Sequence, residues 1–143
     1  MSLQSGLYEL QSTTNQLWAG LGTIQLSDPP PPTPLKGLEY EMKGEFEIAH
    51  QCDNSYHILI PGMNKSELRS EADVVKLMPF APRQSWTIEP TYETSNYLIR
   101  DQDSVNYWTL VDDSDPWGTP IRLQGKRSDL HSQKWRFVAS QRG

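Results

Sequence analysis

Gln84-Ser85-Trp86-Thr87-Ile88 recurs later in the chain as Gln133-Lys134-Trp135-Arg136-Phe137, and in a weaker form earlier as Phe46-Glu47-Ile48. Each of these runs follows, after 30 to 38 residues, a strand-like run built on a tyrosine. The three tyrosines are Tyr8, Tyr56 and Tyr97. A diverged repeat of about 40 to 50 residues indicates that one small unit is used three times to build a single core.

Short strand candidates separated by turn signals run along the whole sequence. No window of a dozen residues carries an apolar stripe of helical spacing without a Pro or Gly inside it, which argues against helices. Twelve candidates can be marked, four in each repeat. They are 7–11, 17–21, 38–41, 45–49, 56–60, 67–70, 74–77, 85–89, 97–100, 107–111, 121–124 and 134–138.

Twelve strands in three groups of four predict an all-β fold, the β-trefoil, in which hairpins cap a six-stranded barrel with threefold pseudo-symmetry. We expect a single domain over residues 1–143, with repeats of about 6–50, 51–90 and 91–139. Phe46, Trp86 and Trp135 should fill the barrel interior, because burying a large aromatic ring stabilises a fold by a few kcal/mol. Gln84 and Gln133 should hydrogen-bond the backbone of adjacent turns.

Composition and charge narrow the classes of partner. The net charge is −5 and the sequence pI about 5.1, which argues against a nucleic-acid partner because such a surface needs clustered Lys and Arg. No apolar run approaches the 18 residues of a membrane-spanning helix, so no membrane partner is expected. The sequence starts without the basic and apolar segments of a signal peptide. Together with a single cysteine, Cys52, this predicts a cytoplasmic protein.

Candidate catalytic and metal-binding residues are few. The histidines and Cys52 show no metal-ligand spacing, and nothing orients a pair formed by His50 and Cys52. The acidic run 112–115 lacks the spacing and glycine of a calcium loop and is best interpreted as a turn. We therefore expect no cofactor, no metal and no catalytic residue, and the sequence favours a binding module over an enzyme.

A proline-rich segment, 27–37, interrupts the first repeat. Five prolines among six positions fix φ and remove N–H donors, so this segment cannot form a central strand. It can be a rigid connector between two strands. It can equally be a stiff loop offered to a partner, because such a loop loses little entropy on binding.

The two Gln-x-Trp motifs resemble the repeat signature of ricin-B-type β-trefoil lectins. In that family an Asp in the second strand of a repeat usually holds the sugar hydroxyls, and no repeat of this chain keeps it. A carbohydrate-binding function therefore implies a different site. The candidates are Trp117, whose ring could stack on a hexose, with Asp113 and Asp115 as acceptors. The competing interpretation is that Trp117 packs under its own turn.

Blocks along most of the chain also resemble small fungal β-trefoil protease inhibitors, the cospin-like serine protease inhibitors of mushrooms. Those blocks are 1–10, 19–20, 28–34, 56–62, 86–88, 97–99, 107–110 and 118–123. The resemblance implies a defence protein that presents a rigid loop to a protease, more often a serine protease. We expect the protein to be a monomer or homodimer. The inhibitory loop would contain Leu26, Ser27, Asp28 and Lys36. Leu26 suits an apolar primary pocket and Lys36 suits trypsin, although the stretch 26–28 lacks the basic residue of the trypsin-directed members.

Overall fold

The structure is a computed structural model that describes residues 3–24, 27–110, 118–127 and 130–140. Within these ranges it contains fourteen strands and two short 3-10 helices. The strands are β1 (Gly6–Ser12), β2 (Trp18–Gly20), β3 (Thr33–Pro34), β4 (Lys36–Leu38), β5 (Phe46–Cys52), β6 (Ser55–Leu59), β7 (Ser66–Glu71), β8 (Val74–Pro79), β9 (Ser85–Pro90), β10 (Asn96–Asp101), β11 (Tyr107–Thr109), β12 (Thr119–Pro120), β13 (Arg122–Gln124) and β14 (Trp135–Ala139). The helices are η1 (Tyr40–Met42) and η2 (Leu130–Gln133).

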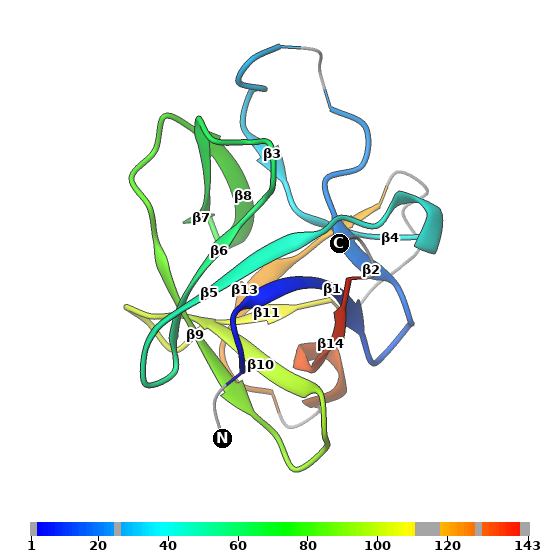
Figure 1. Cartoon of the computed structure of the whole chain (residues 1–143). Coiled ribbons are helices and arrows are strands. Elements are labelled where there is room, and N and C mark those ends of the chain that lie inside the picture. Colours follow the sequence, from blue (N-terminus) through cyan, green and yellow to red (C-terminus); the bar gives the residue numbers. More distant parts are fainter. Residues whose placement is uncertain (1–2, 25–26, 111–117, 128–129, 141–143) are drawn as a thin grey trace.

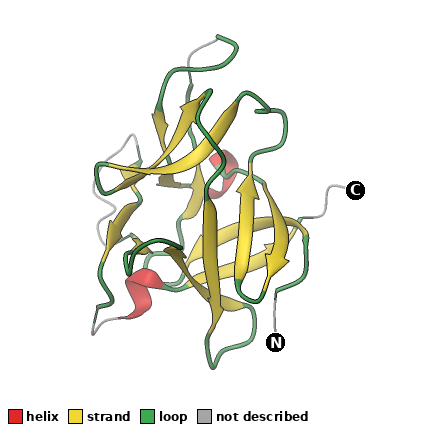
Figure 2. Ribbon diagram, turned by 90° about the vertical axis from the view of Figure 1, so that its left-hand side faces the viewer, coloured by secondary structure: helices red, strands yellow, loops and turns green. Residues whose placement is uncertain are grey.

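Six of the strands form a closed barrel (Figure 1). Antiparallel pairing runs from β1 to β5, β6, β9, β10 and β14, and then back to β1. Closing the sheet leaves no free edge along the barrel, which removes a site where another chain could add a strand. Strands make up nearly all of the regular structure, as the side view shows (Figure 2).

The repeated sequence pattern corresponds to a repeated strand pair. Tyr8 lies opposite Phe46, Tyr56 opposite Trp86, and Tyr97 opposite Trp135. Each pair joins the first and last barrel strands of one repeat. The three closing aromatics are fully buried in one hydrophobic core, as predicted.

Three hairpins cap the barrel, and the backbone ties them together. The hairpins are β2 with β4, β7 with β8, and β11 with β13. Where they meet, the N–H of Leu35 donates to the carbonyl of Val75 at 2.8 Å, Val75 to Ile121 at 3.1 Å, and Ile121 to Leu35 at 2.8 Å. All three residues are completely buried. Each repeat therefore gives and accepts one hydrogen bond in a closed ring, and the architecture is the predicted β-trefoil.

The strand count and one strand position differ from the prediction. Eleven predicted strands overlap observed ones closely, but the strand expected over 38–41 lies at Lys36–Leu38, and Tyr40–Met42 forms η1 instead. At the centre of the observed strand Gly37 packs closely against the third repeat, where a Cβ atom would lie 2.4 Å from Cδ2 of Leu110. The two strands beyond twelve, β3 and β12, are two-residue pairs that link hairpins of different repeats.

The proline-rich segment contributes one of these short strands. Thr33 and Pro34 lie opposite Leu77 and Lys76 of β8, at one end of the strand order. An edge position tolerates proline because the missing N–H faces away from the partner strand. Within the described part of the chain, no helix has the length and apolar character needed to cross a membrane.

The core tryptophan of the third repeat provides a test of this architecture. Trp135 is fully buried, and its ring N–H donates to the carbonyl of Trp108 at 3.1 Å. We expect Trp135→Ala to lower the free energy of unfolding by about 3–5 kcal/mol, because the substitution leaves a large cavity. Urea denaturation followed by circular dichroism measures this change. Tyr92→Ala, at a fully exposed ring, is the matched control and should leave the midpoint unchanged.

Candidate functional site

The first candidate site is the loop that connects β2 to β3, residues 21–32. Its described parts, 21–24 and 27–32, extend away from the barrel and the hairpin cap (Figure 1). Ser27 and Asp28 are exposed near its outer end. Of the predicted inhibitory residues, Leu26 lies outside the described residues.

Local hydrogen bonds and one ion pair hold the second half of this loop. The hydroxyl of Ser27 donates to the carbonyl of Pro29 at 3.1 Å, and that of Thr33 donates to the carbonyl of Pro31 at 2.7 Å. Lys65, from the turn before β7, places its ammonium 3.2 Å from Oδ2 of Asp28. The ion pair is exposed and contributes at most about 1 kcal/mol, so the prolines and the β3–β8 pairing supply most of the restraint.

The exposed part of the proline-rich segment is shorter than predicted. Pro30, Thr33 and Leu35 are buried, because the chain turns inward there to reach β8 and the centre of the cap. Lys36 lies in β4, opposite Gly20 of β2 and Pro120 of β12, with a half-buried side chain. The structure therefore places Ser27 and Asp28 in the projecting loop and Lys36 in the hairpin cap.

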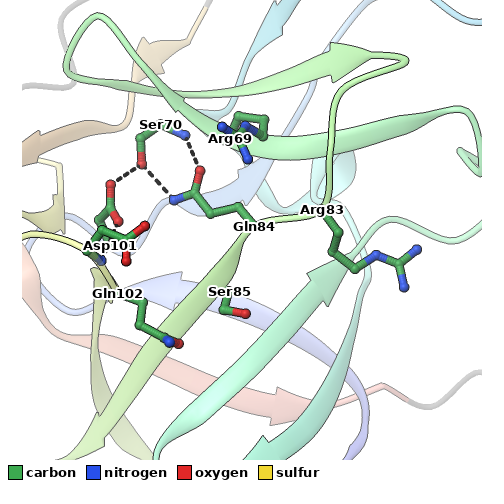
Figure 3. A pocket seen from close by; sticks show the side chains of 8 residues that line it. Arg69, Ser70, Arg83, Gln84, Ser85, Asp101 and Gln102 are labelled. Carbon is green, nitrogen blue, oxygen red and sulfur yellow. Dashed lines mark hydrogen bonds between the residues drawn. The ribbon is translucent and has the colours of Figure 1, made fainter.

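The second candidate site is a polar pocket of about 390 Å³ at the boundary between the second and third repeats (Figure 3). Eight residues from β7, the segment that enters β9, and the turn after β10 surround it. They are Arg69, Ser70, Arg83, Gln84, Ser85, Asp101, Gln102 and Asp103. None of these eight side chains is aromatic, so the described residues of the pocket offer no ring on which a sugar could stack.

Hydrogen bonds connect β7, the segment that enters β9, and the end of β10 across the wall of this pocket (Figure 3). The amide oxygen of Gln84 accepts from the backbone N–H of Ser70 at 2.9 Å, and its amide nitrogen donates to the Ser70 hydroxyl at 2.8 Å. That hydroxyl donates to Oδ2 of Asp101 at 2.6 Å. The network satisfies half-buried polar groups and orients the Asp101 carboxylate, whose other oxygen accepts from the N–H of Asp103 at 2.9 Å.

The two arginines of the pocket are both engaged by protein groups. Arg83 donates two hydrogen bonds of 3.1 Å to Glu67, and these bonds raise the pKa of its guanidinium. Its side chain points away from the Ser70–Gln84–Asp101 network (Figure 3). Arg69 donates to the carbonyl of Pro82 at 3.2 Å. The amide oxygen of Gln102 accepts from the Ser55 hydroxyl at 2.6 Å. The free hydrogen-bonding capacity of the pocket therefore lies mainly with the amide nitrogen of Gln102, the hydroxyl of Ser85 and the carboxylate of Asp103.

The glutamine of the third repeat occupies a closed environment instead. Gln133 is fully buried, accepts from the N–H of Arg127 at 3.0 Å, and donates to Thr109 at 3.1 Å and to the carbonyl of Gly125 at 2.9 Å. Gln133 thus binds the backbone of the adjacent turn, as predicted, whereas Gln84 binds the backbone of strand β7 in its own repeat. In the first repeat, Gly44 stands two residues before the closing aromatic, where the other repeats carry glutamine.

The remaining predicted site residues are not placed. Trp117, Asp113 and Asp115 lie outside the described residues. Among the residues that the structure describes, His, Cys, Asp and Glu side chains form no group of three or more that could hold a metal ion. The ring of His50 is hydrogen-bonded to the carbonyl of Asp53 at 2.7 Å, and Cys52 is exposed nearby in the chain.

Comparison with protein-family models and with curated proteins gave no match. Solved structures do match. A proteinase inhibitor from Coprinopsis cinerea has a TM-score of 0.79 at 10% identity, covering 96% of this chain and 99% of that one. ThreeFoil, a designed threefold-symmetric protein, has a TM-score of 0.71 at 14% identity, covering 94% and 99%. A ricin B-like lectin from Macrolepiota procera, solved with lactose, has a TM-score of 0.70 at 15% identity, covering 98% and 100%. These identities establish the fold alone.

The different environments of the two glutamines give a matched prediction. We expect Gln133→Ala to lower the free energy of unfolding by about 2 kcal/mol or more, because buried polar groups lose their hydrogen-bond partners. Gln84→Ala should lower it by about 1 kcal/mol or less, because water in the open pocket can replace the amide. Thermal or urea unfolding of both variants measures the difference. Equal losses of unfolding free energy in the two variants would contradict this expectation, because both glutamines would then contribute equally to stability.

Proposed function

We propose that this protein inhibits a protease by inserting the projecting loop, residues 21–32, into the active-site cleft. The observation that carries the proposal is the exposed Ser27–Asp28 segment at the outer end of a restrained loop on a closed barrel. The fold shared with the Coprinopsis cinerea proteinase inhibitor is consistent with this function. The inhibitor requires no catalytic group of its own.

The proposed mechanism depends on rigidity. An extended, restrained segment occupies a substrate cleft without the ordering cost that a flexible peptide incurs. The prolines fix φ along 29–32, and the β3–β8 pairing fixes the point where the loop rejoins the cap. A complex of this kind dissociates slowly, because dissociation breaks all contacts of a rigid surface together.

Leu26 is the proposed residue for the primary pocket, and a serine protease of chymotrypsin or subtilisin type is the proposed target class. Its apolar side chain fits a hydrophobic pocket, and the exposed Ser27 and Asp28 follow it directly. Lys36 is the weaker alternative for trypsin. It lies in β4 with a half-buried side chain, which limits how far its ammonium could reach into a deep pocket.

The test compares three proteins against trypsin, chymotrypsin, subtilisin and a cysteine protease. We expect the unaltered protein to inhibit chymotrypsin or subtilisin, and Leu26→Gly to weaken that inhibition by roughly tenfold or more, because the primary-pocket side chain is lost. Lys36→Ala should inhibit as the unaltered protein does. The inhibition constants come from progress curves of chromogenic substrate hydrolysis.

Two results would contradict this proposal. Equal inhibition by all three proteins would place the inhibitory contact on another part of the trefoil. Absence of inhibition across the whole protease panel would reject the inhibitor function altogether.

Carbohydrate binding is the second candidate function. The observation in its favour is the polar pocket, where Gln102, Ser85 and Asp103 present donors and acceptors suited to sugar hydroxyls. The lack of an aromatic ring in the lining ranks it below the inhibitor, because stacking supplies much of the affinity in sugar sites. The fold shared with a lactose-bound lectin is consistent with carbohydrate binding but does not change this ranking of the two functions.

A glycan array tests this second function. If the pocket binds a glycan, Asp103→Ala should reduce the signal, because an exposed acceptor is removed while the Ser70–Gln84–Asp101 network stays intact. Glu41→Ala, at an exposed carboxylate on η1, is the control and should bind normally. No signal from the unaltered protein across the array would remove carbohydrate binding from consideration.

A further inference from the structure

Phe80 occupies the turn between β8 and β9 with its side chain directed to solvent. The side chain is 77% exposed. Its backbone adopts a φ of +57°, in the left-handed region. That conformation is disfavoured for a bulky residue and is adopted most easily by Gly, Asn or Asp.

The stability of the folded chain does not account for a phenylalanine at this position. The ring gains little from burial, and Gly or Asn would adopt the backbone conformation at a lower cost. The backbone N–H of Phe80 donates to the carbonyl of Lys65 at 2.7 Å, and any non-proline residue could make this bond. An exposed aromatic side chain in a strained backbone position is best explained by a contact outside the molecule.

The position of Phe80 in the fold brings it close to the projecting loop. Lys65, whose carbonyl holds Phe80, also places its ammonium 3.2 Å from the carboxylate of Asp28. The pairing of β3 with β8 places Thr33 opposite Leu77. Phe80 directly follows Pro79, the last residue of β8, and so stands three residues beyond Leu77 in the chain.

We infer that Phe80 is a second contact for the protease that takes the loop, on the protein surface beside the substrate cleft. This inference rests on the proposed inhibitor function. The partner is a protease that carries an apolar depression next to its cleft, on the side facing Lys65. The ring of Phe80 fills that depression while the Ser27–Asp28 segment occupies the cleft.

A second contact fits the physical requirements of a tight inhibitor. Aromatic anchors in desolvated pockets carry a large share of interface energy. The loop and Phe80 are fixed to each other through Lys65 and through β8, so both contacts form in one binding event without additional ordering. The effect of Phe80 should appear mainly in the dissociation rate, as is usual for short-range contacts within one interface.

The chain offers a matched control at Val105. This residue is 72% exposed in the turn between β10 and β11, and it has no described contact with Lys65 or with the projecting loop. Val105→Asn removes a comparable exposed apolar group from another part of the surface.

The experiment measures inhibition, dissociation rate and melting temperature for the unaltered protein, Phe80→Asn and Val105→Asn, with the protease panel described above. For a protease that the unaltered protein inhibits, we expect Phe80→Asn to dissociate about tenfold faster or more. Its melting temperature should stay the same or rise, because Asn suits the left-handed backbone. Val105→Asn should match the unaltered protein in all three measurements.

Three other outcomes would overturn the inference. If Phe80→Asn inhibits and dissociates like the unaltered protein, Phe80 makes no contact with the protease, and the inhibitor function stands. If Phe80→Asn weakens inhibition but also melts more than about 4 °C lower, the residue acts through the fold. If the unaltered protein inhibits no protease in the panel, the inhibitor function and the second contact are rejected together.

Discussion

A ring of three backbone hydrogen bonds joins the repeats at the centre of the cap, and much of the remaining structure follows from it. Leu35, Val75 and Ile121 are completely buried, so an N–H or carbonyl left without a partner there would lose a hydrogen bond with no water to replace it. Because each repeat donates once and accepts once, the ring closes only when all three hairpins are in place. The short bridging strands β3 and β12 add further backbone pairing between hairpins of different repeats.

The same ring of hydrogen bonds shows which connection between strands is longer than the fold requires. In the second repeat, only Ala72, Asp73 and Val74 separate the end of β7 from Val75, and the first two adopt the positive φ values of a tight hairpin turn. In the first repeat, 14 residues separate the end of β2 from Leu35, yet Leu35 occupies the equivalent place in the ring. The additional residues extend outward as the projecting loop. Their sequence is free of the constraints that fix the ring and the barrel, so it can be adapted to a partner at little cost to stability.

The sequence predicts the barrel well because its signal is periodic and local. The Tyr–aromatic pairs recur once per repeat, and each closing aromatic is buried as a large apolar residue in a strand should be. The polar pocket could not be predicted, because Ser70, Gln84 and Asp101 come from three separate segments of the chain and no short motif connects them. The close approach of Gly37 to Leu110, within the displaced strand Lys36–Leu38, joins residues that are distant in the sequence, so no local pattern signals it. For Phe80, the flanking Pro79 and Pro82 signal a turn, but neither the exposure of the ring nor the link to Asp28 through Lys65 can be read from the sequence.

Comparison of the three equivalent positions shows why the core does not determine the function. Gly44, Gln84 and Gln133 each stand two residues before a buried aromatic of the barrel. Gln133 is enclosed by its hairpin, and Gln84 borders an open polar pocket. The barrel beneath keeps the same Tyr–aromatic pairing in all three cases. Since the stabilising contacts are shared and the surface around them is not, inhibitors and lectins can use one fold. The asymmetric elements of this chain therefore carry more information about function than its symmetric core. These elements are the long loop of the first repeat and the exposed Phe80.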